Sequence, residues 1–446
     1  MSKYLNFILF CNVAFITNLI LIEAAYCPGK PSPSAQPNLN PIIDEKPLLV
    51  SEIKNAKLYT VGSGDDLIKI VHLWGTPYEM GYAHATIAMS EMYQFFAYVW
   101  TFIESQIKSS LNGNTEGFFK DEFLKLVADN GLELALEIES NKTEIYISNH
   151  FLEEIQGMAD AAGIDPKAYK QFYMISELGK TSSSMFGAWG LAIPSVEGLL
   201  QLGAIDWGTD SGFQNVPQIT VYHPNKDSST NGHDFANIGW SGWIGSFQGY
   251  SSKKLAVSQI GVSYPDISFG EESLYGTPFT YVLRDILQFD STFDDAFNRI
   301  KNAKRTSNLI LGIGDGKINK FNSIQYSASV ANCMDDTTLK PDADWHPKIT
   351  NVVYHGVDWL CPSFNQVMAG QITKLYGNLT TENAIRDVTS IVQTGSLLVT
   401  YYDFENDVIY TANARGYEEE GPENAYERSF VKIKMNDLFS ELPPNL

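Results

Sequence analysis

The pattern of apolar residues changes at about residue 180, and this change limits the folds open to the chain. Before it, helical periodicity predicts helices over residues 77–109, 118–139, 143–162 and 165–179, the third with Thr143 as its N-terminal cap. After it, short runs rich in Val, Ile, Tyr and Trp predict strands over residues 185–193, 199–207, 218–223 and 254–262. Helices and strands in separate runs are typical of an α+β fold and not of a doubly wound sheet.

The rest of the chain continues this mixture of elements. A strand is predicted over 66–74, helices over 278–289 and 291–303 with Ser291 as a cap, strands from 308 and around 324, helices over 362–376 and 381–392, and a hairpin over 397–414. A chain of 446 residues that is 44% hydrophobic can bury a large core. We expect one large domain or two modest ones.

The N-terminus carries a targeting signal. Lys3 precedes an apolar run over residues 5–22 that ends in Glu23-Ala24-Ala25, which predicts a cleaved signal peptide at 1–25 and a secreted or lysosomal protein. An uncleaved signal anchor is the alternative, since about 20 apolar residues span a bilayer. No later segment predicts a membrane span. Residues 26–50 are rich in proline and predict an extended linker, followed by a mainly helical region at 51–182 and a strand-rich region at 183–446.

Charge and cysteine content narrow the partners and the compartment. The 52 acidic and 31 basic residues give a net charge of -21, which disfavours nucleic acid and anionic membrane surfaces as partners. After signal cleavage Cys27, Cys333 and Cys361 remain in an oxidising compartment, and a Cys333–Cys361 disulfide is the expected pair. The sequons at Asn141 and Asn378 predict N-glycosylation.

The chain lacks the usual signatures of metal and cofactor enzymes. It has no His-Glu-x-x-His, no phosphate-binding Walker loop and no Gly-x-Ser-x-Gly elbow, and its histidines do not cluster with ligand spacing. The glycine-rich run at 312–316 predicts a turn between two strands. We therefore expect neither a metal nor a cofactor.

A run of three serines, Ser182 to Ser184, begins the strand-rich region, and Asp206-Trp207 follows at the end of the next predicted strand. Serine needs a base before it can act as a nucleophile. A chain break before one of these serines would free an α-amine with a pKa of about 7.7–8.0, which could be that base. The alternative is a loop whose hydroxyls bond their own backbone. Nearby aromatic residues, among them Trp240, Trp243 and Phe247, predict core packing or an acyl pocket.

Several blocks, in their order along the chain, resemble the penicillin acyltransferase group of N-terminal nucleophile (Ntn) hydrolases, with acid ceramidase as a more distant relative. The similarity covers most of residues 65–330, and no single block is decisive. The blocks are Gly75-Thr76-Pro77-Tyr78-Glu79-Met80-Gly81-Tyr82-Ala83-His84, Leu152-Glu153-Glu154-Ile155-Gln156-Gly157-Met158-Ala159, the serine run, Asp206-Trp207, Gly249-Tyr250-Ser251, Leu255-Ala256-Val257-Ser258-Gln259-Ile260-Gly261-Val262-Ser263 and Ala303-Lys304-Arg305-Thr306-Ser307-Asn308.

The resemblance implies a fold, a reaction and a site. The fold is four-layered, with two sheets between two helical layers. Family members cleave themselves before a cysteine that then attacks an amide or thioester. Alignment on the Phe-x-Ala-Trp-Gly segment places Ser183 at that cysteine, while shifts of one residue select Ser182 or Ser184. Asp206 then matches the acidic residue near the nucleophile, and Asn308 is the candidate oxyanion-binding amide. The implied substrate is a small acylated amine, such as a lipid amide.

The chain also departs from the family pattern close to this site. Family members carry a polar Arg-Asn or Gln-Asn pair where this chain has Gly203-Ala204, and the Gly-x-Asn turn is Gly249-Tyr250-Ser251 here. These differences favour a second hypothesis from another class. In it the chain is a secreted, catalytically inactive protein of the same fold that binds a ligand or has a structural role.

Overall fold

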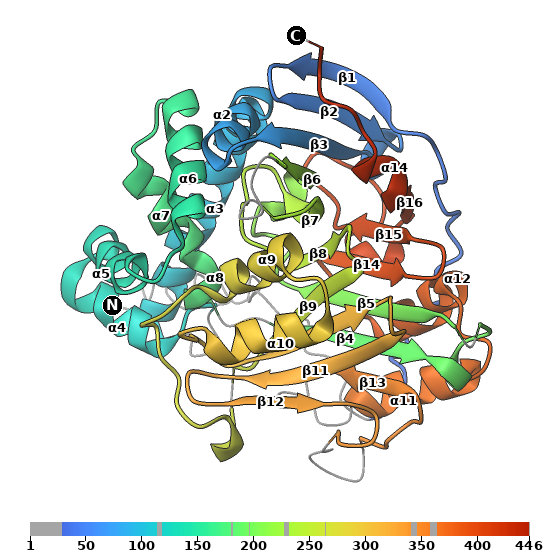
Figure 1. The fold of residues 1–446 in the computed structure, drawn as a ribbon. Helices are drawn as coiled ribbons and strands as arrows, with labels where there is room; N and C mark the ends of the chain where they lie inside the picture. Colours follow the sequence, from blue (N-terminus) through green and yellow to red (C-terminus); the bar gives the residue numbers. More distant parts are fainter. Residues whose placement is uncertain are drawn as a thin grey trace, which may run out of the picture.

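The computed structural model describes residues 29–113, 118–179, 182–195, 197–226, 232–263, 265–339, 346–356 and 364–445. The predicted signal peptide, Cys27 and Cys361 lie outside these ranges. The described chain mixes helices with two β-sheets, so the predicted α+β class is the observed one (Figure 1). No helix among the described residues combines the length and the apolarity needed to cross a bilayer.

The larger sheet has ten strands and is built from both regions of the chain. Neighbouring strands are antiparallel except β3 and β6, which are parallel. The first three strands therefore join the sheet of the strand-rich region. In spatial order the strands are β1 (Leu48–Ile53), β2 (Ala56–Val61), β3 (Ile68–Gly75), β6 (Pro217–Pro224), β7 (Phe235–Trp240), β8 (Gln248–Ser251), β9 (Leu255–Gly261), β10 (Leu309–Asp315), β11 (Lys320–Tyr326) and β12 (Ala331–Met334).

The smaller sheet has six antiparallel strands and contains the serine run. Its β14–β15 hairpin lies within the hairpin predicted at 397–414. In spatial order the strands are β13 (Val352–His355), β4 (Ser182–Trp189), β5 (Leu199–Asp206), β14 (Leu398–Asp403), β15 (Val408–Asn413) and β16 (Val431–Lys434).

The two sheets pack face to face, and glycines permit their close approach. A Cβ atom on Gly187 would lie 2.1 Å from Cβ of Phe321 in the opposite sheet. Residues 312–315 lie within strand β10, where Gly312 and Gly314 serve sheet packing. The turn predicted at 312–316 is therefore wrong for these residues, and the turn between β10 and β11 begins only at Gly316. Outside the larger sheet lie α9 (Phe279–Phe289) and α10 (Phe293–Asn302). Outside the smaller sheet, α11 (Phe364–Leu375), α12 (Thr381–Ala384) and α13 (Ser390–Val392) pack on an apolar cluster with β4 and β5.

The helical region is divided more finely than the sequence pattern predicts. Thr143 lies inside a helix, where its hydroxyl donates to the Ser140 carbonyl, so its predicted capping role is wrong. Figure 1 shows α3 to α7 gathered on one side of the molecule, opposite α11 and α12. The helices are α2 (Pro77–Ile87), α3 (Met89–Leu111), α4 (Asp121–Asn130), α5 (Leu132–Glu144), α6 (Asn149–Ala162), α7 (Pro166–Tyr173), α8 (Ile175–Leu178) and, near the C-terminus, α14 (Met435–Phe439).

The proline-rich segment is held against the C-terminal part of the chain, and strand β1 begins within the linker predicted at 26–50. The side-chain amide of Asn38 donates to the carbonyl oxygens of Tyr426 and Arg428, both at 2.9 Å. Ile43 forms a parallel β-bridge with Val431. Residues 29–47 therefore form a strap along β16, the edge strand of the smaller sheet, and strand β1 begins directly after it.

Candidate active site

The serine run forms the start of strand β4 and lies beside the end of strand β5. In this antiparallel pair Ser182 is opposite Asp206, and Ser184 is opposite Ala204. Opposite residues of such a pair have Cα atoms about 4.5–5.5 Å apart. The strand pairing therefore brings together the serines and the aspartate that the sequence selected.

Ser183 points into the space between the two sheets. Its neighbour Met185, on the same face of β4, contacts Ser258 of the larger sheet. The Ser183 side chain is 0% exposed, and its Oγ donates to the carbonyl oxygen of Ser182 at 2.5 Å. The hydroxyl thus lies on the carbonyl group of the peptide bond that precedes it.

Ser184 points to the opposite face of β4 and is linked to Asp206 through a third residue. Thr394 Oγ1 donates to Asp206 Oδ2 at 2.8 Å, and Ser184 Oγ lies 2.5 Å from Thr394 Oγ1. The single hydroxyl proton of Thr394 is used on the carboxylate, so Ser184 is the donor to Thr394. Ser184, Thr394 and Asp206 form one hydrogen-bonded chain on the face opposite Ser183.

The Asp206 carboxylate is held by a tight turn after α13. The backbone N–H groups of Gly395 and Ser396 donate to Asp206 Oδ1 at 2.7 Å and 2.9 Å. Gly395 has φ +86, and a Cβ there would lie 2.1 Å from a methyl group of Val399, so only glycine fits this turn. Burial raises the pKa of Asp206, while hydrogen bonds from Ser396, Thr394 and Gly395 act against this shift.

Strand β10 starts at the same end of the sheets as β4. A Cβ on Gly312 would lie 2.7 Å from Met185 Sδ, and one on Gly314 would lie 2.2 Å from Gln201 Oε1. Gln201 is paired with Gly187, two residues beyond Met185. Strand β10 therefore runs in the same direction as β4. The residues just before β10 lie at the end of the sheets where the serine run begins.

Asn308 directly precedes β10 and so lies at this end. It is 5% exposed, and its Oδ1 has no hydrogen-bond partner among the described residues. The Asn308 carbonyl accepts from Val262, and the preceding Ser307 has φ +56. A buried amide with an unpartnered oxygen is costly, which marks Asn308 as a functional candidate.

A buried carboxyl group that the sequence analysis missed lies just before the serine run. Glu177, in the short helix α8, accepts from the backbone N–H of Phe279 at 2.7 Å and from Ser307 Oγ at 3.0 Å. Lys120 Nζ donates to the same Ser307 hydroxyl at 3.0 Å. Burial raises the pKa of Glu177, and the positive charge of Lys120 opposes the shift. Its sequence context is an ordinary helix end, so no local signal identifies it.

The aromatic residues near Asp206 are packed core. Trp207 is 5% exposed, and its ring centroid lies 5.3 Å from Phe247 and 6.3 Å from Trp240. Trp243 stacks on Phe247 at 5.4 Å. This confirms the core interpretation of the aromatic cluster.

The remaining predicted sites lie elsewhere. Asn141 and Asn378 are both exposed, but Asn141 lies within helix α5 and Thr143 of its sequon is buried. The modification of both stays a prediction. Cys333 is a free, half-buried thiol on the edge strand β12. Its predicted disulfide partner Cys361 lies outside the described residues, so the Cys333–Cys361 pair stays a prediction. The pairing is predicted from the number of cysteines and from the position of both in the strand-rich region, and neither carries information on distance. The described residues contain no group of three or more His, Cys, Asp or Glu suited to hold a metal ion.

Fold and site together define an α+β protein with two packed sheets and a serine–threonine–aspartate cluster where β4 begins. The chain belongs to the family of the dcd1 proteins of Dictyostelium discoideum. It is 32% identical to Protein dcd1A over 425 residues, which covers 91% of this chain and 93% of dcd1A. It is also 32% identical to Protein dcd1B over 417 residues, covering 91% of this chain and 81% of dcd1B. No family model matches the chain.

Solved structures give weaker matches. An N-acylethanolamine-hydrolyzing acid amidase ortholog from Caenorhabditis elegans has a TM-score of 0.35 and 15% identity, over 49% of this chain and 91% of its own. A variant of conjugated bile acid hydrolase from Clostridium perfringens has a TM-score of 0.35 and 14% identity, over 58% and 95%. TM-scores in this range do not define a shared fold.

Proposed function

We propose that the chain is a self-processing Ntn-type amidohydrolase or acyltransferase with Ser183 as its nucleophile. One observation carries the proposal. Ser183 Oγ lies 2.5 Å from the Ser182 carbonyl oxygen, on the peptide group that self-cleavage before Ser183 must attack. The helix–sheet–sheet–helix order of the fold supports the four-layer αββα class that the sequence blocks imply.

The proposed self-processing starts from this contact. Ser183 Oγ attacks the carbonyl carbon of Ser182, the Ser182–Ser183 C–N bond breaks, and the acyl group passes to the oxygen as an ester. The proton of the hydroxyl goes to the departing nitrogen. Water then hydrolyses the ester and leaves a free carboxylate on Ser182 and a free α-amine on Ser183.

Ser182 is paired with Asp206 across the two strands. The freed amine belongs to the next residue, Ser183, and so lies close to Asp206. With a pKa of about 7.7–8.0 the amine takes the Ser183 hydroxyl proton as the oxygen attacks an acylated amine. Asp206, fixed by its three donors, orients the amine, and Asn308 with backbone amides binds the oxyanion. The amine product leaves with the proton, and water or a second acceptor takes the acyl group.

We propose small acylated amines, lipid amides among them, as the substrate class, and the secretory route to the cell exterior or the lysosome as the setting. The acidic composition and the N-terminal apolar run support this route. No cofactor takes part in this reaction scheme.

A second candidate is an inactive ligand-binding protein of the same fold, and one contact favours it. Gly203 stands where the family carries a polar side chain, and a Cβ there would lie 3.0 Å from Gln248 Nε2. The Gln248 side chain therefore occupies the space beside Gly203. In this candidate the chain stays intact and the buried Ser183 serves packing.

Intact mass and N-terminal sequencing of the secreted protein separate the candidates. We expect two fragments, the second starting at Ser183, and a single chain in Ser183→Ala. Ser176→Ala is the matched control, since its buried hydroxyl donates to the Tyr173 carbonyl and takes no part in the cluster at Asp206. Cleavage that survives in Ser183→Ala removes Ser183 from the mechanism, and a start at Ser182 or Ser184 moves the nucleophile. An intact wild-type chain at neutral and acidic pH selects the binding protein.

A further inference from the structure

The histidines that precede Ser183 share one feature, which concerns the contact surface between the chain before Ser183 and the chain from Ser183 onward. We call this surface the seam. Each of these histidines contacts the later part of the chain through its imidazole ring. They are His72 in β3, His84 in α2 and His150 in α6.

His72 contacts a second histidine across the seam. Strand β3 pairs in parallel with β6, and His72 Nδ1 lies 3.0 Å from Nε2 of His223. The two side chains are 2% and 6% exposed. One nitrogen donates and the other accepts, so the contact holds a single proton. A proton on both nitrogen atoms would set two N–H groups against each other and break the contact.

His84 is held with no proton on its Nε2 atom. The Nε2 amide group of Gln218 in β6 lies 2.9 Å from His84 Nε2, and the backbone N–H of Gly242 donates to the same atom at 3.2 Å. Both neighbours are donors, so His84 Nε2 is the acceptor. The ring is 0% exposed. Protonation of Nε2 would therefore break both contacts with the later part of the chain.

His150 differs from these two because its partner is a carboxylate. His150 Nε2 lies 2.9 Å from Asp285 Oδ1 in α9. A protonated imidazole donates to a carboxylate in a charge-assisted hydrogen bond. Protonation therefore preserves this contact, and His150 serves as a reference within the same seam.

The groups around His72 disfavour its protonation. Lys57 in β2 is opposite His72, and Glu441 pairs with Lys57 at 2.7 Å. Burial lowers the pKa of His72 from its ordinary value of 6.5 to about 3, and His223 and Lys57 act in the same direction. His72 has no carboxylate partner among the described residues.

The carboxylate nearest to this pair lies beyond His223. Asp234 Oδ2 is 3.5 Å from His223 Nδ1, and Lys226 Nζ is 3.6 Å from the same oxygen. A first proton on the histidine pair can therefore reside on His223 beside Asp234. The second proton, on His72, is the one that breaks the contact across the seam.

The groups around His84 act in the same sense. Burial lowers the pKa of His84 from 6.5 to about 3, and the charge of Arg284 in α9 adds to this effect. The carboxylate in this region, Glu154 of α6, is paired with Arg284 at 2.6 Å. His84 thus remains neutral while the seam is closed.

An open seam takes up protons that the closed seam does not bind. Once the two rings face water, each has a pKa of about 6.5. Opening therefore becomes more favourable as the pH falls from about 6.5 to about 3. We propose that His72 and His84 make the seam a pH-sensitive switch, which holds the part before Ser183 tightly at neutral pH and loosens it in acid.

The consequence for the proposed active site rests on the proposed function, whereas the switch itself does not. After self-cleavage before Ser183, only non-covalent contacts hold the earlier part. Acid would then allow this part to move away from the start of β4, and neutral pH would keep it in place.

The test measures opening of the seam in the full-length secreted protein. Hydrogen–deuterium exchange at pH 7 and pH 5, corrected for intrinsic exchange rates, gives the protection of the β3 amides that bond to β6. We expect acid to lower this protection by roughly 25-fold for each of the two histidines, and several hundredfold in the wild type. Strands β14 and β15 of the smaller sheet are the internal reference.

Two variants keep a hydrogen-bonding atom near the imidazole nitrogen and cannot titrate. His72→Asn and His84→Gln should each remove one factor of roughly 25 from the acid response. His150→Gln is the matched control within the seam and should not reduce the response, because the Asp285 contact survives protonation.

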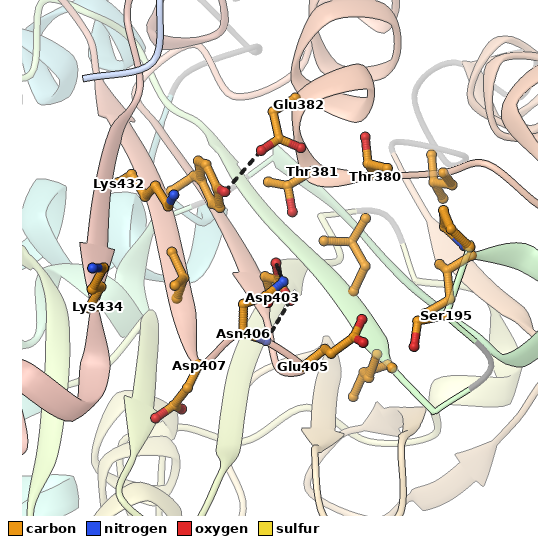
Figure 2. A pocket seen from close by; sticks show the side chains of 18 of the residues that line it. Ser195, Thr380, Thr381, Glu382, Asp403, Glu405, Asn406, Asp407, Lys432 and Lys434 are labelled. Atoms are coloured by element: carbon orange, nitrogen blue, oxygen red, sulfur yellow. Dashed lines mark hydrogen bonds between the residues drawn. The ribbon is translucent and has the colours of Figure 1, made fainter. Parts of the chain in front are cut away.

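A groove of about 650 Å³ beside the loop from β4 to β5 offers a control away from the seam (Figure 2). The described residues that line it all follow Ser183 and include no histidine. Tyr410→Phe removes the hydrogen bond of 3.1 Å that Glu382 accepts there. This variant should show the acid response of the wild type at β3.

Glu177 also crosses the seam, and its raised pKa acts in the opposite direction. It is present in every variant, so the comparison between variants isolates the histidines. An acid response that is equal in the wild type, His72→Asn and His84→Gln overturns the proposal. Equal loss of protection at β3 and at β14 in the wild type overturns it as well, because the whole fold then responds, and this comparison needs no variant to fold.

Intact mass of the same samples separates this inference from the proposed function. An uncleaved chain whose β3 protection falls in acid supports the switch and removes self-processing. A cleaved chain whose β3 protection is unchanged supports self-processing and overturns the switch.

Discussion

At the scale of single residues, Asp206 is the group on which the candidate site depends. Three donors from the turn at residues 394–396 converge on its two oxygens. A carboxylate with this environment is fixed in position and orientation. This arrangement suits a group that must hold a neighbouring amine rather than one that must move.

We expect Asp206→Asn to lower the free energy of unfolding by about 2–3 kcal/mol, because the new amide N–H₂ group faces donors and loses charge-assisted hydrogen bonds. Self-cleavage should fail in the same variant. Urea denaturation and intact mass measure the two effects. Thr394→Ser retains the hydroxyl and is the control. If Asp206→Asn unfolds at the wild-type urea concentration and cleaves normally, the role given to Asp206 is wrong.

Glu177 predicts a dependence of stability on pH. Its folded-state pKa lies above its ordinary value of 4.5, so between these two values the folded protein keeps a proton that the unfolded chain has released. Stability from this group therefore falls as the pH rises through that window. Glu177→Gln does not titrate. We expect the stability of the wild type relative to this variant to decrease above about pH 4.5; parallel profiles in denaturation experiments at stepped pH would contradict this.

At the scale of elements, helices α2 and α6 cross with their backbones in contact. A Cβ on Gly81 would lie 2.1 Å from the Glu154 carbonyl oxygen, and one on Gly157 would lie 2.1 Å from that of Tyr78. Two glycines on facing helices therefore set the separation of the crossing. Both belong to blocks that the sequence resemblance selected, and the crossing gives them a packing role.

We expect Gly81→Ala and Gly157→Ala each to lower the free energy of unfolding by at least about 2 kcal/mol, because the added methyl group meets backbone that cannot yield without moving a helix. Gly370→Ala in α11 is the control. A Cβ there has no neighbour within 4 Å, and alanine favours a helix by up to about 1 kcal/mol. Thermal or urea unfolding measures the free energy of unfolding of all three variants. Equal changes in this free energy would contradict the packing role given to Gly81 and Gly157.

The sequence predicts elements well where the pattern is local. The strand predicted at 199–207 is β5. The predicted cap Ser291 is wrong by one residue, because Thr292 caps α10 and forms the capping box with Asp295. Helix breaks were missed where no proline marks them. The predicted helix at 118–139 is broken at Gly131, whose φ of +82 leaves the helical region.

The site was predictable only in part, for a related reason. Ser183 and Asp206 are close in sequence and are joined by one strand hairpin, so their proximity follows from local pattern. Thr394 lies 188 residues from Asp206, and Glu177 lies 130 residues from Ser307. Contacts of this range depend on how the sheets and helices pack, which periodicity does not encode.

At the scale of the whole molecule, the proposed cleavage site divides the chain but not the fold. The part before Ser183 contributes the strap at 29–47 and strands β1 to β3. Strand β3 pairs in parallel with β6 along its length, from Lys69 opposite Gln218 to Gly75 opposite Pro224. The two parts are thus joined by a continuous sheet and by the strap, with no reliance on the peptide bond before Ser183.

We therefore expect the two parts to remain one particle after cleavage. To test this, residues 26–182 and 183–446 are co-expressed as separate chains. In neutral buffer the two chains should co-elute in size-exclusion chromatography, separate only in denaturant, and unfold in a single transition. The reason is that separation would leave an unpaired sheet edge on each part. This version tests the interlock whether or not the natural chain cleaves itself. The Ser183→Ala single chain, which cannot use Ser183 for processing, gives the reference elution volume. Elution as two species in neutral buffer would show that the shared sheet and the strap do not hold the parts together, and self-processing would then have to release the N-terminal part.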